Sequence, residues 1–156
     1  MRLVVLSAAA TFVIDQITKF VVVQMLDLYG RQEILVLPPW ITFRMAWNEG
    51  INFGLMANSS DIARLALIAL AIAISVWVWA WVKREPHSAT VHISAGLLIG
   101  GAMGNVLDRI IYGAVADFLN MSVPGISNPY SFNVADIAIF AGAIGLVFFT
   151  GREKTT

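Results

Sequence analysis

The chain has 156 residues, of which 58% are hydrophobic and 13% are charged, and its ten basic and ten acidic residues give a formal net charge of zero. A soluble domain carries about 25% charged residues, so this composition excludes an ordinary soluble protein and predicts a membrane protein. The neutral charge offers no basic surface for nucleic acid. Without cysteine the chain can form neither a disulfide framework nor a thiolate nucleophile.

The first apolar segment, residues 3–26, is long enough to cross a bilayer, which takes about 20 residues of helix. Arg2 and the alanines at 8–10 resemble parts of a signal peptide, but the apolar run continues well beyond them. We therefore expect a retained helix. Asp15 and Lys19 interrupt it one turn apart, which fits either mutual neutralisation or a functional role.

The next segment, residues 27–61, contains a β-prone apolar run at 33–37, a break at Pro38 and Pro39, and an alternating pattern at 40–47. This order predicts a small strand pair at the membrane interface, with tryptophans at the depth of the headgroups.

Three further apolar segments follow, at residues 62–82, 91–112 and 132–150, so we predict one membrane domain of four spans over residues 1–156. Lys83 and Arg84 lie between the second and third spans, and Arg152 and Lys154 lie in the tail. By the positive-inside rule both termini are cytoplasmic, and residues 27–61 and 113–131 lie outside.

With this orientation, the polar residues of different spans gather near the outer face. Charges inside a membrane are costly and usually functional, and a shared depth indicates a site. The third span also carries small residues at every fourth position, which favours close packing of helices. The polar residues are Asp15, Lys19, Asn105, Asp108, Arg109, Asn133 and Asp136, with Asp117 just beyond the third span; the glycines are Gly96, Gly100 and Gly104.

Carboxylates carry the chemistry that this cluster supports best. The two histidines, His87 and His92, lie at the opposite end of the third span, which argues against a histidine-based metal site or a serine–histidine pair. Asp117 and Asp136, at the end of one span and the start of the next, can share one proton and act as acid and base. The residues therefore favour a membrane aspartyl hydrolase without metal or cofactor. A small proton-coupled transporter and an assembly protein remain as alternatives.

Five sequence blocks in order resemble lipoprotein signal peptidase (signal peptidase II), a family of bacterial intramembrane aspartyl proteases. The blocks are residues 15–19 (DQITK), 48–54 (NEG with FG), 100–109 (GGAMGN with DR), 115–118 (VADF) and 132–136 (FNVAD). Together they span nearly the whole chain. At two positions, Asn52 and Ile137, the chain differs from the residue that is usual in the family, but neither difference removes a catalytic group.

The resemblance implies an all-α membrane protein of four transmembrane helices, with a small extracytoplasmic β-sheet cradle and a short lid helix. It implies removal of signal peptides from diacylglyceryl-modified prolipoproteins, just before the lipidated cysteine. Inhibition by the cyclic peptide globomycin is also implied, and we expect a monomer in the bacterial inner membrane. Asp117 and Asp136 match the family's catalytic pair; the positions that match substrate-binding or site-supporting residues are Asp15, Lys19, Asn48, Gly50, Gly104, Asn105, Asp108, Arg109, Asn133 and Ala135.

Overall fold

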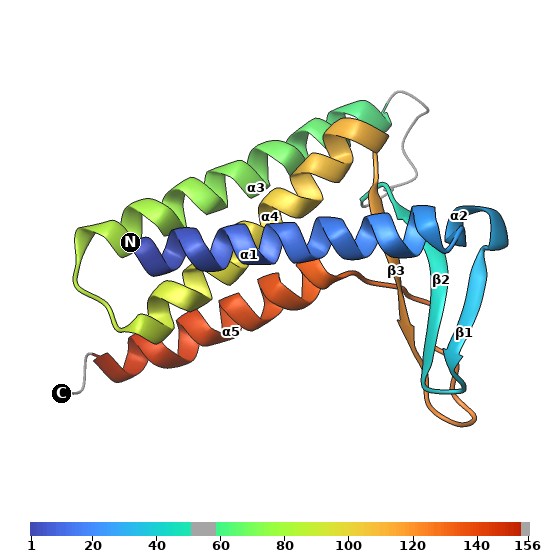
Figure 1. The fold of residues 1–156 in the computed structure, drawn as a ribbon. Coiled ribbons are helices and arrows are strands. Elements are labelled where there is room, and N and C mark those ends of the chain that lie inside the picture. The colour runs from blue at the N-terminus through green and yellow to red at the C-terminus, as the bar shows by residue number, and fades with distance from the viewer. Residues whose placement is uncertain (51–58, 154–156) are drawn as a thin grey trace.

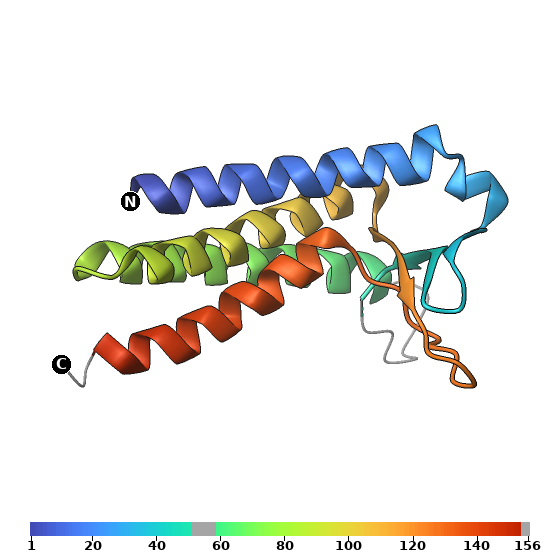
Figure 2. The same ribbon diagram turned by 60° about the horizontal axis from the view of Figure 1, so that its bottom comes forward.

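Four long helices lie side by side and a small sheet closes one end of the bundle (Figure 1). The computed structural model describes residues 1–50 and 59–153. The long helices are α1 (Arg2–Lys19), α3 (Ser59–Arg84), α4 (Ala89–Tyr112) and α5 (Val134–Glu153). The N-terminus, the α3–α4 connection and the last described turn of α5 lie at the end opposite the sheet, as the rotated view in Figure 2 also shows.

Three of these helices are long and apolar enough to cross a membrane: Arg2–Met25, Asp61–Arg84 and Ala89–Tyr112. Large apolar side chains are exposed along them, as with Ile62 and Trp77, which fits a lipid environment. The fourth predicted span is a shorter apolar helix, Val134–Thr150. The fourth membrane span therefore stays a prediction.

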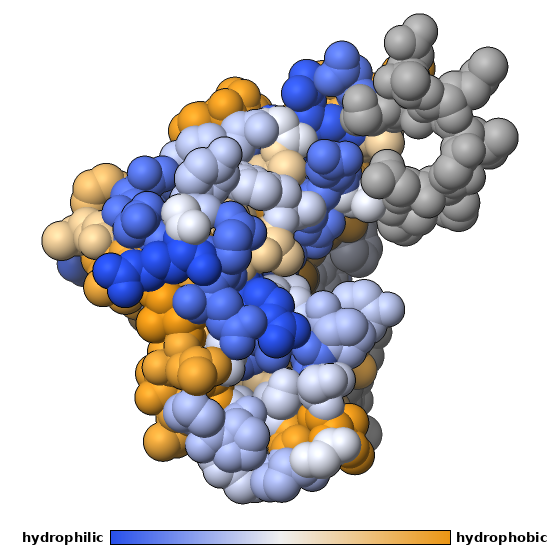
Figure 3. All heavy atoms as spheres, turned by 90° about the vertical axis from the view of Figure 1, so that its right-hand side faces the viewer, coloured by the Kyte–Doolittle hydropathy of each residue, from blue (hydrophilic) through white to orange (hydrophobic). Residues whose placement is uncertain are grey.

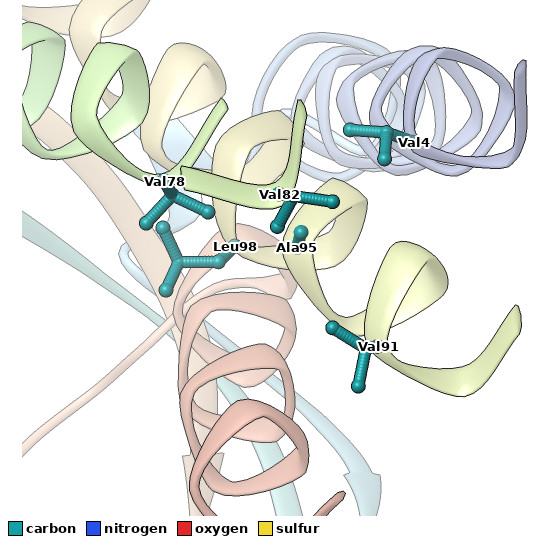
Figure 4. Packing of buried hydrophobic residues seen from close by; sticks show 6 residues of the cluster. All are labelled: Val4, Val78, Val82, Val91, Ala95 and Leu98. Carbon is teal, nitrogen blue, oxygen red and sulfur yellow. The ribbon is translucent and has the colours of Figure 1, made fainter. Parts of the chain in front are cut away.

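α4 is the central helix, in contact with α1, α3 and α5. A Cβ atom on Gly96 or Gly100 would collide with α1, at the carbonyls of Val4 and Ala8 respectively. The stripe of glycines thus lets α1 approach α4 closely, as predicted. At the end away from the sheet, an apolar cluster joins three helices (Figure 4); its members are Val4, Val78, Val82, Val91, Ala95 and Leu98.

The first span is not one uninterrupted α-helix. After Lys19 it continues as a π-helix, η1 (Phe20–Met25), and then turns at Asp27 into the short helix α2 (Leu28–Arg31). Hydropathy does not distinguish the two helical forms, because both satisfy the backbone within the segment.

The sheet is antiparallel with strand order β1–β2–β3. The predicted strand pair is confirmed as β1 (Glu33–Leu37) and β2 (Ile41–Asn48). β3 (Val115–Met121) was not predicted: we expected a simple connection after the third span. Its residues are almost continuously buried, so it lacks the alternation that marks a half-exposed strand.

Seen from the sheet end, the molecule is polar across its middle and apolar along parts of its edge (Figure 3). This arrangement suits a cap that meets water beside a membrane-embedded bundle. Residues 51–58, which include Asn52 and part of the second sequence block, lie outside the described residues, so the lid helix stays a prediction.

Candidate active site

Asp117 lies just beyond the third span, as predicted, but on the strand β3 that the sequence did not predict. The pairing of β2 with β3 shifts register between Phe43, opposite Leu119, and Ala46, opposite Asp117. Such a bulge puts an extra residue on one strand and re-aims the neighbouring side chains. Asp117 is 3% exposed.

The chain before α5 runs along the free edge of β3. Phe132 and Leu119 exchange backbone hydrogen bonds, with N–O distances of 3.0 Å and 2.8 Å. This pairing brings Asn133 beside Asp117 and sets the position at which α5 begins.

Asn133 is the N-cap of α5, one residue before the helix begins, whereas we predicted that the fourth span starts at residue 132. Its side-chain oxygen accepts a hydrogen bond from the Asp136 backbone N–H at 2.9 Å, and Asp136 Oδ2 accepts one from the Asn133 N–H at 3.2 Å. This reciprocal pair satisfies two backbone donors that the helix start leaves free. It holds the Asp136 carboxyl at the positive end of α5, where negative charge is stabilised.

Two asparagines connect the aspartates. The Asn133 side-chain amide donates to Asp117 Oδ1 at 2.6 Å and to Asn105 Oδ1 at 3.3 Å. The Asn105 amide in turn donates to Asp136 Oδ1 at 2.9 Å. The two carboxyls predicted to act together are therefore bound to a common residue and lie close enough for their charges to interact.

Asn48, at the end of β2, supports Asp117 from the other side. Its amide donates to Asp117 Oδ2 at 3.1 Å, and its side-chain oxygen accepts from the Gly50 N–H at 3.0 Å. Gly50 has φ of +98°, and a Cβ there would collide with Leu67. The turn that orients Asn48 therefore requires glycine.

A second polar group lies behind the aspartates. The Lys19 ammonium donates to Asp15 Oδ2 at 2.8 Å and to Asp108 Oδ2 at 2.7 Å, and all three side chains are nearly inaccessible to solvent. The Gln16 amide also reaches both carboxylates, at 3.1 Å each. A Cβ on Gly104 would lie 2.6 Å from Asp15 Oδ2, so this glycine makes room for the group.

Backbone groups beside the aspartates contact this second group. Asp15 Oδ1 accepts from the N–H of Ala135, a fully buried residue, at 2.9 Å. Asp108 Oδ2 accepts from the N–H of Ala116 at 3.2 Å. The structure thus brings the predicted site residues into one connected region. Arg109 is the exception, because its hydrogen bond to a described residue is to the Asn105 carbonyl within α4.

Arg109 lies beside this region, and the described residues use little of its hydrogen-bonding capacity. Its guanidinium makes one long bond, 3.4 Å, to the Asn105 carbonyl, and its buried Nε has no partner among the described residues. The charges of Asp117, Asp136 and Asp108 act on it. A guanidinium held in this way can bind a carbonyl oxygen of a ligand.

Burial of its carboxyl raises the pKa of Asp117 to about 6, and the charge of Asp136 reinforces the shift. The hydrogen bonds from Asn48 and Asn133 oppose it but do not cancel it. Asp117 is therefore a carboxyl that keeps its proton to a higher pH than a free aspartate. This property suits general acid catalysis.

Two hollows flank the aspartates. An apolar groove of about 310 Å³ lies between α3, α4 and α5; it ends at Asn105 and Arg109. A smaller cleft of about 150 Å³ lies between η1 and the end of α4, over Lys19 and Asp108. In the described part of the chain, no group of three or more histidine, aspartate or glutamate side chains is arranged to hold a metal.

Sequence reasoning missed two residues. Gln16 lies within the first sequence block, but we did not predict that it belongs to the site. Its polar side-chain amide within an apolar span could have indicated this role. Ala116 acts through its backbone N–H, which no residue type can reveal.

Comparison with known proteins gives a consistent result. A family model described as signal peptidase (SPase) II matches residues 7–151. The chain is 40% identical over 144 residues to a lipoprotein signal peptidase of Methylobacterium sp. (strain 4-46), with 92% of this chain and 86% of that one covered. It is 34% identical over 147 residues to a lipoprotein signal peptidase of Nitrobacter hamburgensis, with 92% and 88% covered.

The fold is similar to two solved structures of bacterial membrane enzymes. One, determined at 2.3 Å resolution, has a TM-score of 0.77 at 23% identity, and the match covers 98% of this chain and 89% of the solved chain. The other, at 1.9 Å, has a TM-score of 0.78 at 22% identity, with 92% and 89% covered. At these identities the likeness shows a common fold.

Proposed function

Because the chain belongs to the signal peptidase II family, we propose that Asp117 and Asp136 are the catalytic pair with which it cleaves signal peptides from lipoprotein precursors. The observation that carries this proposal is the position of Asn133, which donates to Asp117 through its side chain and to Asp136 through its backbone. Two carboxyls held to one residue at a water-facing end of the bundle suit a shared-proton pair.

The burial and hydrogen bonds of the two aspartates suggest separate roles. Asp117, with its raised pKa, carries the shared proton, and Asp136, at the helix N-terminus, carries the negative charge. Asp136 takes a proton from a water molecule as that water attacks the scissile carbonyl carbon. Asp117 gives its proton to the carbonyl oxygen, so a neutral tetrahedral intermediate forms without a covalent enzyme adduct. Asp136 then gives its proton to the amide nitrogen, and Asp117 takes one back from a hydroxyl of the intermediate as the C–N bond breaks. This releases a carboxylic acid and an amine and restores the single shared proton of the pair.

The pH dependence of the reaction follows from the shared proton. Below about pH 6 the pair holds one proton, and above it Asp117 is deprotonated and the acid is lost. We expect kcat/KM to fall about tenfold per pH unit well above 6. The measurement is the initial rate of cleavage at low substrate between pH 5 and 8.5, with samples returned to pH 5.5 to show that the loss is reversible. A rate that rises through this range would contradict the assignment of the acid.

Arg109 is the candidate for holding the substrate backbone. Its buried Nε has no partner among the described residues, and its side chain lines the apolar groove beside Asn105, which binds Asp136. A guanidinium bound to a substrate carbonyl would orient the scissile peptide before water attacks.

The apolar groove offers a place for the lipid of a diacylglyceryl-modified substrate. Its walls, from Leu67, Leu70, Ile74 and Leu98, are apolar along the helices, and its end lies beside Asn105 and Arg109. A lipid bound there would bring the lipidated cysteine next to the aspartates. Binding energy remote from the scissile bond would then be available for positioning it.

Ala71 on α3 lines the groove, and Ala71→Phe should obstruct it. We expect KM for a diacylglyceryl-modified prolipoprotein to rise about tenfold or more, because roughly 0.8 kcal/mol is lost for each CH₂ left unburied. The matched control is Ala73→Phe, since Ala73 lies on the exposed face of the same helix. Equal KM values for both variants would place the lipid elsewhere.

Several finer features complete the proposal. The enzyme would work as a monomer in the bacterial inner membrane, with both termini cytoplasmic and the aspartates near the outer face. The start of α1 and the last described turn of α5 lie at the same end of the bundle, away from the sheet, which supports this orientation. Lipid and a cyclic peptide such as globomycin would be further partners, the latter with a hydroxyl between the aspartates. The transporter alternative is not favoured by the family match.

The direct test is cleavage of purified diacylglyceryl-modified prolipoprotein by the purified protein in detergent, followed by gel shift. Folded protein without activity would contradict the proposal.

A further inference from the structure

Each of the two aspartates is preceded by an alanine whose backbone N–H is held by another carboxylate. Ala135, before Asp136, donates to Asp15 at 2.9 Å, and Ala116, before Asp117, donates to Asp108 at 3.2 Å. The start of α5 is thereby tied to α1, and the start of β3 is tied to α4.

One side chain joins the two holding carboxylates. The Lys19 ammonium contacts Asp15 at 2.8 Å and Asp108 at 2.7 Å, in a site where the side chains of the three residues are 7%, 0% and 2% exposed. An unbroken chain of contacts therefore runs from Ala135 through Asp15, Lys19 and Asp108 to Ala116. We call Asp15, Lys19 and Asp108 the brace.

The third bond of Lys19 leads to the same aspartates by another route. Its ammonium donates to Asn105 Oδ1 at 3.2 Å. An ammonium has only donors, so the oxygen of this amide must face Lys19 and its nitrogen must face away. That nitrogen donates to Asp136 Oδ1 at 2.9 Å. Lys19 thus also orients the amide that binds Asp136.

We infer that Lys19 is a positioning residue that sets the separation and orientation of the Asp117–Asp136 pair through the brace, without touching the substrate's reacting atoms; this inference rests on the proposed catalytic role of the two aspartates. Without the ammonium, Asp15 and Asp108 would be buried carboxylates without their shared counter-charge. They would separate or take up a proton. Because they hold Ala135 and Ala116, either response moves the residues that follow, Asp136 and Asp117.

The test is Lys19→Met, which keeps much of the side chain's length and removes its charge. We expect kcat to fall about 100-fold, because a misplacement of about 1 Å can cost that much, while KM changes less than about threefold. Lys83→Met is the matched control: Lys83 is exposed near the far end of α3, and its loss should leave kcat unchanged. Rates are divided by the concentration of folded protein, measured by thermal unfolding in the same detergent.

A pH profile separates positioning from a merely structural role. The Lys19 charge lowers the pKa of the Asp117 carboxyl, so its removal should move the alkaline fall in kcat/KM to higher pH. If Lys19 only supported stability, Lys19→Met would lower the folded fraction and leave both the kcat of that fraction and the pH profile unchanged. That result would overturn the inference.

A second substitution keeps the test decisive if Lys19→Met does not fold. In Lys19→Met with Asp108→Asn one buried negative charge is removed together with the positive one, so the brace keeps the net charge of the wild type, and the asparagine oxygen can still accept from Ala116. We expect this double variant to fold, with kcat between those of the wild type and Lys19→Met, and at least about tenfold below the wild type because Asn105 is no longer oriented. Wild-type kcat in the folded double variant would refute the brace. Since the wild-type enzyme would still cleave, that failure is distinct from failure of the proposed function.

Discussion

Asp117→Asn and Asp136→Asn will each lower the rate of prolipoprotein cleavage by about 10²–10⁴-fold, the range expected for loss of a general acid or base. Asparagine has nearly the shape of aspartate but can neither give a proton to the carbonyl oxygen nor take one from water. In Asp117→Asn the acid is lost, and in Asp136→Asn the base is lost. The fold should survive both changes, because the amide oxygen still accepts one of the two bonds at each position: from Asn48 or Asn133 at position 117, and from Asn105 or the Asn133 N–H at position 136.

The measurement is the gel shift of a diacylglyceryl-modified prolipoprotein with equal amounts of folded enzyme. Glu33→Gln is the matched control: it makes the same change of carboxylate to amide on β1, where Glu33 is half-exposed and pairs only loosely with Arg44, at 3.4 Å. We expect wild-type cleavage from this control. Cleavage at a normal rate by either aspartate variant would rule out the pair as the catalytic group.

The second large effect is expected at Asn133, the residue bound to both aspartates. Asn133→Ala removes the 2.6 Å bond to Asp117 and the cap on the Asp136 N–H. We expect kcat to fall about 100-fold, as for other groups that orient a catalytic residue. Loss of the N-cap should also lower the free energy of unfolding by about 0.5–2 kcal/mol.

Asn133→Asp separates these two contributions. Aspartate is an equally good N-cap, so stability of the α5 start is retained. However, the donor to Asp117 is replaced by a like charge, so kcat should fall at least as far as in Asn133→Ala. The control is Asn128→Ala, in the same connection but bonded to the backbone of Tyr130. Unchanged kcat in folded Asn133→Ala and Asn133→Asp would show that Asn133 does not orient the pair.

The general location of the site could be predicted from the sequence because burying charge in lipid is costly. Asp15, Lys19, Asn105 and Asp108 stand out within apolar segments, and the direction of each span places them at one depth. β3 could not be predicted, since it is buried on both sides and is recognised only by its pairing with β2 and Phe132. The position of Asp117 therefore could not be derived from helix directions alone.

The amino-acid sequence by itself determined a membrane protein with polar residues gathered at one end, because hydropathy and charge act locally along the chain and require no knowledge of partners. The positions of the two aspartates at neighbouring span ends, far from either histidine, made them a candidate pair, and the family blocks match that pair. Only the tertiary structure decided how the pair is held: Asn133 between the carboxyls, and Lys19 behind them at the centre of the brace. Those contacts join α1, α4, β3 and α5, and three of them pass through backbone N–H groups that every residue type except proline carries. Hydrogen-bond partners of this kind are selected by packing and strand register, so they exist only once the chain has folded.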